Sequence, residues 1–229
     1  TNEVAYYNPL GQYIYMARYD KVVFEQIAEV GITLETLSHW SIYFHEYRHW
    51  LDHIGTLWGQ DFLIDQYRRM LNHLNGKHDN ASPLSPFLLS ELFEKKNLPQ
   101  VSQKVKPKNK HDYWQWSPRT LVIDNLPVFI LDFRDRHGKL VCTTPVTHIS
   151  LFEANALYEE LHLSHHARRD LISDKMIQRI EVMDEQWRYF EQSYNSEFID
   201  YSAAMHITSA VLNTSYYFEA YKIASIIST

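Results

Sequence analysis

The stretch that decides the fold lies near the N-terminus, where residues 33–55 read TLETLSHWSIYFHEYRHWLDHIG. A row of residues follows helical spacing through this stretch, at Leu34, Leu37, Ser41, Phe44, Arg48 and Leu51. The hydroxyl of Thr33 can accept a hydrogen bond from a first-turn amide, and Glu35 suits the positive end of a helix. The stretch therefore predicts a capped helix over residues 34–54.

This helix carries the motif His45-Glu46-Tyr47-Arg48-His49. A spacing of four residues places both imidazoles on one helix face, one turn apart. Both can then bind one tetrahedral zinc ion, at about 2.0–2.1 Å per nitrogen. Glu46 stands beside them, where it can deprotonate a zinc-bound water whose pKa the metal lowers to about 7. The motif predicts one zinc ion on His45 and His49, with Glu46 as general base.

A catalytic zinc site needs a third protein ligand and an open fourth position. The position ten residues after His45 holds Gly55, so the longer motif that ends in a third histidine is absent. His53 lies on the same face, but it is about 12 Å from His45 along the helix axis at 1.5 Å per residue. The third ligand must therefore come from another element.

A second helix is expected from about residue 148 to residue 165, and it offers Glu153 as the third ligand. Two small residues, Ala154 and Ala156, follow Glu153 closely, and they would let the two helices approach each other. Glu159 and Glu160 on the same helix remain alternatives. The sequence leaves this choice open.

The set His45, Glu46 and His49, followed about a hundred residues later by Glu153, resembles the gluzincin branch of the zincin metallopeptidases. The resemblance covers the motif helix, a strand expected at residues 12–16 and the Glu153 helix, and it identifies no subfamily. It implies a zinc-dependent hydrolase that cleaves a peptide or amide bond in a peptide or protein substrate.

The chain departs from the thermolysin-like pattern at Leu157, where that pattern has an aspartate supporting a zinc-bound histidine. Asp52, three residues after His49, is the candidate for that supporting role. The resemblance also implies a histidine or tyrosine that stabilises the oxyanion. His148 is the first candidate, and others are Tyr158, Tyr216, Tyr217 and Tyr221.

Two hypotheses from other functional classes are alternatives to a peptidase. The motifs Glu46-x-x-His49 and Glu159-x-x-His162 match part of the ligand set of a ferritin-like di-iron carboxylate oxidase. A non-catalytic, zincin-like interaction protein is the other alternative. Metal content separates the three, because they require one zinc, two irons and no metal respectively.

The remaining sequence predicts an α+β protein that is mostly helical, with the motif helix packed on a small sheet. Strands are expected at residues 12–16, 120–123, 128–133 and 139–143, and helices at 20–30 and 57–74. Residues 76–118 read as a polar insertion with a short helix near 86–96. Residues 170–229 read as a helical C-terminal subdomain of a single domain that spans residues 1–229.

Composition limits the partners. The net charge of −6 over 229 residues gives no basic face, so no nucleic-acid partner is expected. The chain has no run of 18 apolar residues, so no membrane span is expected. The N-terminus has no signal-peptide pattern, so the cytoplasm is the expected compartment. The one cysteine, Cys142, allows no internal disulfide and is predicted to be a buried strand residue. Oligomeric state leaves no trace in the sequence.

Overall fold

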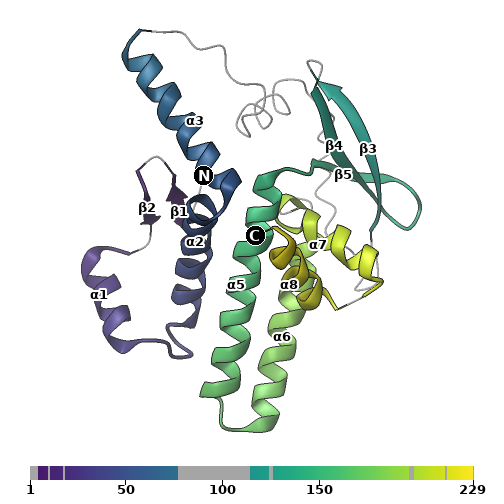
Figure 1. Ribbon diagram of the computed structural model, residues 1–229. Coiled ribbons are helices and arrows are strands. Elements are labelled where there is room, and N and C mark those ends of the chain that lie inside the picture. The colour runs from purple at the N-terminus through teal and green to yellow at the C-terminus, as the bar shows by residue number, and fades with distance from the viewer. Residues whose placement is uncertain are drawn as a thin grey trace. The chain divides into compact units, whose positions relative to one another are not determined.

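The computed structural model describes residues 5–9, 11–17, 19–76, 114–123, 126–195, 199–214 and 216–228. Most of these residues are helical, and the strands form two small antiparallel sheets (Figure 1). The mostly helical α+β class is thus confirmed. The predicted helix near residues 86–96, like most of the predicted insertion, lies outside the described residues.

The chain divides into two compact units. The first contains the described residues up to 76 together with residues 155–186, and the second contains residues 114–154 and 187–228. Two helices, α5 (His148–Leu171) and α6 (Lys175–Ser193), each begin in one unit and end in the other. Within the described residues, no helix combines the length and the apolar character needed to cross a membrane.

The first unit begins with a hairpin of β1 (Ala5–Asn8) and β2 (Tyr13–Met16). The Asn8 carboxamide oxygen accepts the Gly11 N–H at 2.8 Å, and Gln12 has a positive φ of 54° in this turn. The predicted strand at residues 12–16 is confirmed, but its predicted sheet is wrong. It pairs with β1 and not with the strands of the second half of the chain. A partner this close in sequence requires little loop-closure entropy.

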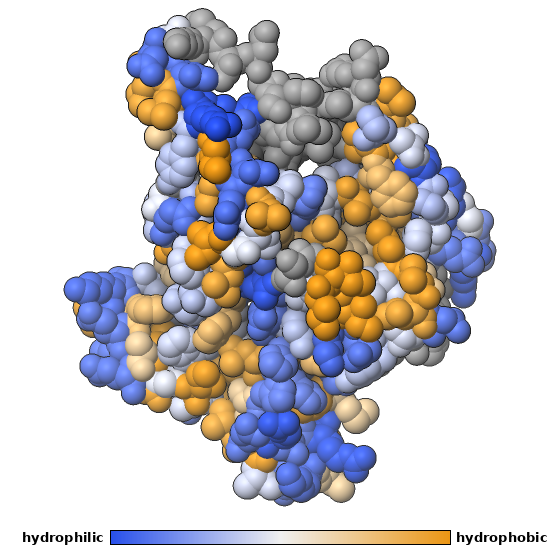
Figure 2. Space-filling view, in the orientation of Figure 1, coloured by the Kyte–Doolittle hydropathy of each residue, from blue (hydrophilic) through white to orange (hydrophobic). Residues whose placement is uncertain are grey.

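Helix α1 (Lys21–Val30) follows, capped by the Asp20 carboxylate, which accepts the Val23 N–H at 2.9 Å. Figure 2 shows the outer surface of α1, at the left of the view, as hydrophilic. The motif helix is α2 (Leu37–Gly55), and it begins later than predicted. The prediction of Thr33 as its cap is wrong. The Thr33 hydroxyl instead accepts the Thr36 N–H at 3.2 Å, in a turn that precedes the helix.

Helix α3 (Leu57–Leu74) confirms the prediction for residues 57–74. The Thr56 hydroxyl caps it by accepting the Gly59 N–H at 2.9 Å. A Cβ atom at Gly59 would lie 2.3 Å from the backbone oxygen of Asp52. Glycine at this position therefore allows α3 to start directly against the end of α2.

The second unit is built on an antiparallel sheet in the order β3–β4–β5. Its strands are β3 (Gln115–Ile123), β4 (Leu126–Arg134) and β5 (Leu140–Pro145), and helices α7 (Ile199–Leu212) and α8 (Tyr217–Ser228) follow α6. The three predicted strands are confirmed, but β3 begins at Gln115, inside the stretch predicted to be a polar insertion. The core of the unit consists of Trp114, Leu131, Phe133, Val141, Cys142, Ile199 and Ala203. Cys142 is buried on β5, which confirms its predicted environment.

Candidate metal centre

The three residues proposed as ligands lie together in the structure. One possible ligand atom from each of His45, His49 and Glu153 lies within 4.8 Å of the others, and all three side chains are half-buried. The rings of the two histidines are 5.0 Å apart between centroids and nearly perpendicular. Within the described residues this is the one group of three or more His, Cys, Asp or Glu side chains close enough to hold a metal ion.

Glu153 is positioned by an uninterrupted helix. The boundary between the two compact units falls within the sequence of α5, between Ala154 and Asn155, and the helix is continuous across it. Asn155 is fully buried, and its side-chain amide donates to the Asp52 carboxylate of α2 at 3.1 Å. Glu153 stands two residues before this contact, so the same helical segment holds it near α2.

Three polar contacts join α2 to α5, and we call them the polar ladder. They link Asp52 to Asn155 at 3.1 Å, Arg48 to Glu159 at 3.2 Å, and His45 to Glu160 at 3.4 Å. Residue numbers fall along α2 as they rise along α5, so the two helices run antiparallel. The ladder thus fixes which residues of α5 face the two motif histidines.

The three candidate glutamates have different neighbours in the structure. Glu159 pairs with Arg48, and Glu160 lies against one nitrogen of His45, while Glu153 joins the group of three. Sequence reasoning missed Arg48 and Asn155 as parts of the site. A signal for Arg48 was present, because Arg48 and Asp52 are spaced as a helical i, i+4 ion pair.

Asp52 is a buried part of the ladder, with only 1% of its surface exposed. Arg48 Nε donates to its carboxylate at 2.9 Å, in addition to the bond from Asn155. Burial raises the pKa of Asp52, and the charge of Arg48, the Asn155 hydrogen bond and the charge of His49 oppose that rise. Asp52 is therefore an interhelical contact close to His49, and its supporting role toward a zinc-bound imidazole stays a prediction.

The general-base candidate, Glu46, is buried, with 9% of its surface exposed. It follows His45 directly on α2, so its side chain leaves the helix about 100° around the axis from that of His45. Carboxylates are rarely buried unless paired. Glu46 is thus an enclosed carboxylate next to a proposed ligand, and its role as general base stays a prediction.

The oxyanion candidates are dispersed. His148 is the first residue of α5 and has an exposed side chain, with its pKa lowered by partial desolvation. Tyr158 stacks on His162, with ring centroids 5.5 Å apart. Tyr217 and Tyr221 are buried in the second unit. None of these residues belongs to the three-residue group, and the role of His148 stays a prediction.

The positions of the side chains support a di-iron site less than they support a single zinc ion on His45, His49 and Glu153. The set Glu46, His49, Glu159 and His162 is not among the possible ligand groups within the described part of the chain. Glu159 instead accepts a hydrogen bond from Arg48, whose guanidinium would repel a nearby cation. His162 packs edge-on against His166, with centroids 4.4 Å apart.

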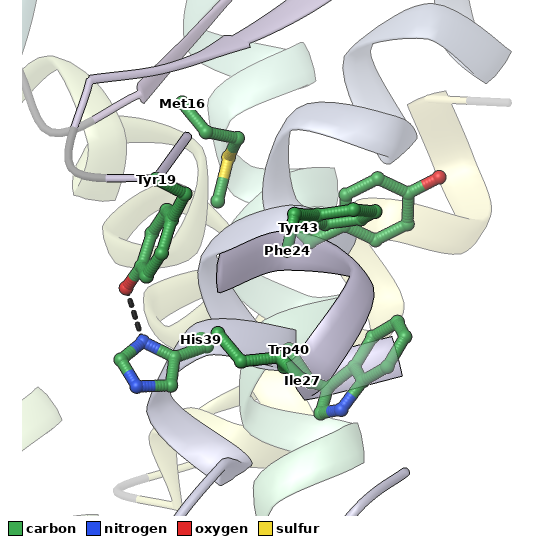
Figure 3. A pocket seen from close by; sticks show the side chains of 7 residues that line it. All are labelled: Met16, Tyr19, Phe24, Ile27, His39, Trp40 and Tyr43. Carbon is green, nitrogen blue, oxygen red and sulfur yellow. Dashed lines mark hydrogen bonds between the residues drawn. The ribbon is translucent and has the colours of Figure 1, made fainter. Parts of the chain in front are cut away.

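A small apolar pocket lies elsewhere on the first unit, which the sequence did not indicate. It is lined by Met16, Tyr19, Phe24, Ile27, His39, Trp40 and Tyr43 (Figure 3). The Tyr19 hydroxyl and His39 Nδ1 form a hydrogen bond at its edge. At 3.6 residues per turn, Trp40 and Tyr43 lie about 140–160° around α2 from His45. The pocket therefore belongs to a different face of α2 than the ligand group.

Comparison with protein-family models, with curated proteins and with solved structures finds no match for this chain. The resemblance to gluzincins thus rests on the motif residues and their spacing. The function has to be argued from the donor set, the burial and the charges around it.

Proposed function

We propose that this chain is a zinc-dependent hydrolase that cleaves a peptide or amide bond. The observation that carries the proposal is the approach of His45, His49 and Glu153 from two helices, with ligand atoms within 4.8 Å of one another. Two imidazoles and one carboxylate form a donor set typical of catalytic zinc, which leaves a fourth position for water or substrate.

The charge balance around the three residues also favours a bound cation. Glu46 and Asp52 are buried, and Glu153 and Glu160 are half-buried. The polar ladder supplies one guanidinium, Arg48, which already pairs with Asp52 and Glu159. A nearby cation offsets the free-energy cost of burying carboxylates. A divalent ion on the two imidazoles and Glu153 would be such a cation.

Within this proposal each residue has a defined task. His45, His49 and Glu153 would hold the ion, which when bound lowers the pKa of water and polarises a carbonyl oxygen. Glu46 would accept a proton from the water while the water oxygen attacks the carbonyl carbon. Glu46 would then pass that proton to the leaving nitrogen as the C–N bond breaks, which returns Glu46 to its ionised form.

Elemental analysis of protein purified without added metal tests the proposal. We expect about one zinc ion per chain, and its loss in His45→Ala and His49→Ala, because two remaining ligands hold zinc poorly. Exposed His137, in the turn between β4 and β5, offers a matched control as His137→Ala. Two irons per chain would instead support the hypothesis of a di-iron oxidase. Protein without metal would support the hypothesis of a non-catalytic interaction protein.

A further inference from the structure

We propose that Glu160 is a positioning residue that orients the His45 ring for metal binding. The inference rests on the proposed zinc site. His45 Nδ1 lies 3.4 Å from Glu160 Oε2, and only 14% and 21% of these two side chains are exposed. The contact joins α2 to the part of α5 that belongs to the same compact unit.

The chemistry follows from the two nitrogens of an imidazole. A neutral histidine carries one N–H and one lone pair, and the group that faces each nitrogen decides where the proton resides. At 3.4 Å this contact is electrostatic and is not a hydrogen bond, but the negative charge of the Glu160 carboxylate still favours the proton on Nδ1, the nitrogen that faces it. The lone pair then remains on Nε2, which is the nitrogen left for the ion. A carboxylate in this place also raises the basicity of the ligating nitrogen.

The place of Glu160 in the chain distinguishes this arrangement from the thermolysin-like pattern. The thermolysin-like pattern has its supporting aspartate four residues after the ligand glutamate, where this chain has Leu157, a residue that can accept no proton. Glu160 lies seven residues after Glu153, which is close to two full turns, so both carboxylates lie on one face of α5. One helix face thus supplies a ligand and an orienting carboxylate.

The test compares two carboxylates of α5. Glu160→Ala removes the carboxylate at His45, and Asp170→Ala, the matched control, removes an exposed carboxylate that pairs with Arg169 outside the ladder. Zinc affinity is measured by competition with a chelating dye. We expect Glu160→Ala to weaken zinc binding by about 10–100-fold, the usual effect of losing such a partner. Asp170→Ala should leave the affinity close to the wild-type value. Glu160→Gln keeps a carbonyl oxygen in place and should restore part of the affinity.

A second measurement needs no variant. Long-range ¹H–¹⁵N NMR of zinc-loaded wild-type protein reports which nitrogen of His45 carries the proton, and we expect Nδ1. A proton on Nε2, or equal zinc affinity in Glu160→Ala and wild type, would overturn the role of Glu160 and leave the zinc site intact. Wild-type protein that binds no zinc would overturn both proposals.

Discussion

Different interactions stabilise the α2–α5 helix pair and the core of the β3–β5 sheet. Charged and polar side chains join α2 to α5, including Asp52 and Asn155, which are almost fully buried. The sheet core is apolar, and Leu131 and Phe133 in it have no exposed surface. A buried apolar side chain of this size stabilises a fold by about 1.5–3 kcal/mol.

The two regions also differ in how much their contacts stabilise the fold. Burial raises the pKa of Asp52 even with two donors on its carboxylate, so its ionised form is held there at a cost in free energy. Apolar residues of similar volume would often stabilise a helix pair as well or better. Polar groups that stabilise so little would be explained if this helix pair holds the proposed metal ligands.

The largest expected effect is on the chemistry at α2. Glu46→Gln keeps the shape of the side chain but cannot take a proton from water. General acid–base catalysis is worth about 10²–10⁴-fold, and loss of both proton transfers should reduce hydrolysis by about the upper value. Cleavage of a peptide library and zinc content are measured together. Wild-type cleavage rates in this variant, with zinc bound, would show that Glu46 is not the base.

The next effect tests the apolar region. Phe133→Ala should lower the free energy of unfolding by about 3–5 kcal/mol, because it leaves a cavity in the core of the second unit. Denaturant unfolding measures the loss. Phe129→Ala on the same strand is the control, since 44% of Phe129 is exposed and its loss should be much smaller. Equal losses for the two variants would contradict the assignment of this core.

A buried histidine of the second unit should make stability depend on pH. The pKa of His206 is lowered to about 4 by complete burial, although its Nε2–H donates to the Ser193 carbonyl at 2.7 Å. The unfolded chain, with a pKa of about 6.5, binds the proton more readily. The contribution of His206 is therefore full above pH 6.5 and is lost as the pH falls toward 4, by about 3 kcal/mol.

The matched variant for this prediction is His206→Gln, whose amide can still donate to Ser193 but does not titrate. Unfolding of both proteins is followed at several values between pH 7 and pH 4. The wild type should lose about 3 kcal/mol more than the variant over this range. Parallel curves would place the titrating group elsewhere.

The smallest effect concerns the polar ladder. Asn155→Ala removes one donor from buried Asp52, so the pKa of Asp52 should rise further. An unsatisfied buried partner costs about 1–3 kcal/mol of stability. Thermal unfolding at neutral pH measures this loss, and Asn195→Ala, which is only half-buried, serves as the control. Unchanged stability in Asn155→Ala would mean that the ladder contributes nothing to holding α5 on α2.

The sequence by itself determined the helices and strands that depend on local periodicity. The approximate spans of α1, α3, β4 and β5, and the burial of Cys142, follow from patterns within single segments, whereas β3 begins five residues before its predicted start. The placement of His45 and His49 on one face is likewise a property of any helix that contains them. Periodicity also indicated α2, but it placed the start of the helix too early. The Thr33 hydroxyl accepts the Thr36 N–H in a turn that precedes the helix.

Tertiary structure alone decided which distant residues meet. Three glutamates of α5 were candidates for one place, and the antiparallel register of α5 on α2 sends Glu153 to the histidine pair, Glu159 to Arg48 and Glu160 to His45. The pairing of β2 with β1 is a similar case. The physical reason is common to both. A local period specifies which face of an element is apolar, but the register between two elements is set by contacts that neither segment encodes alone.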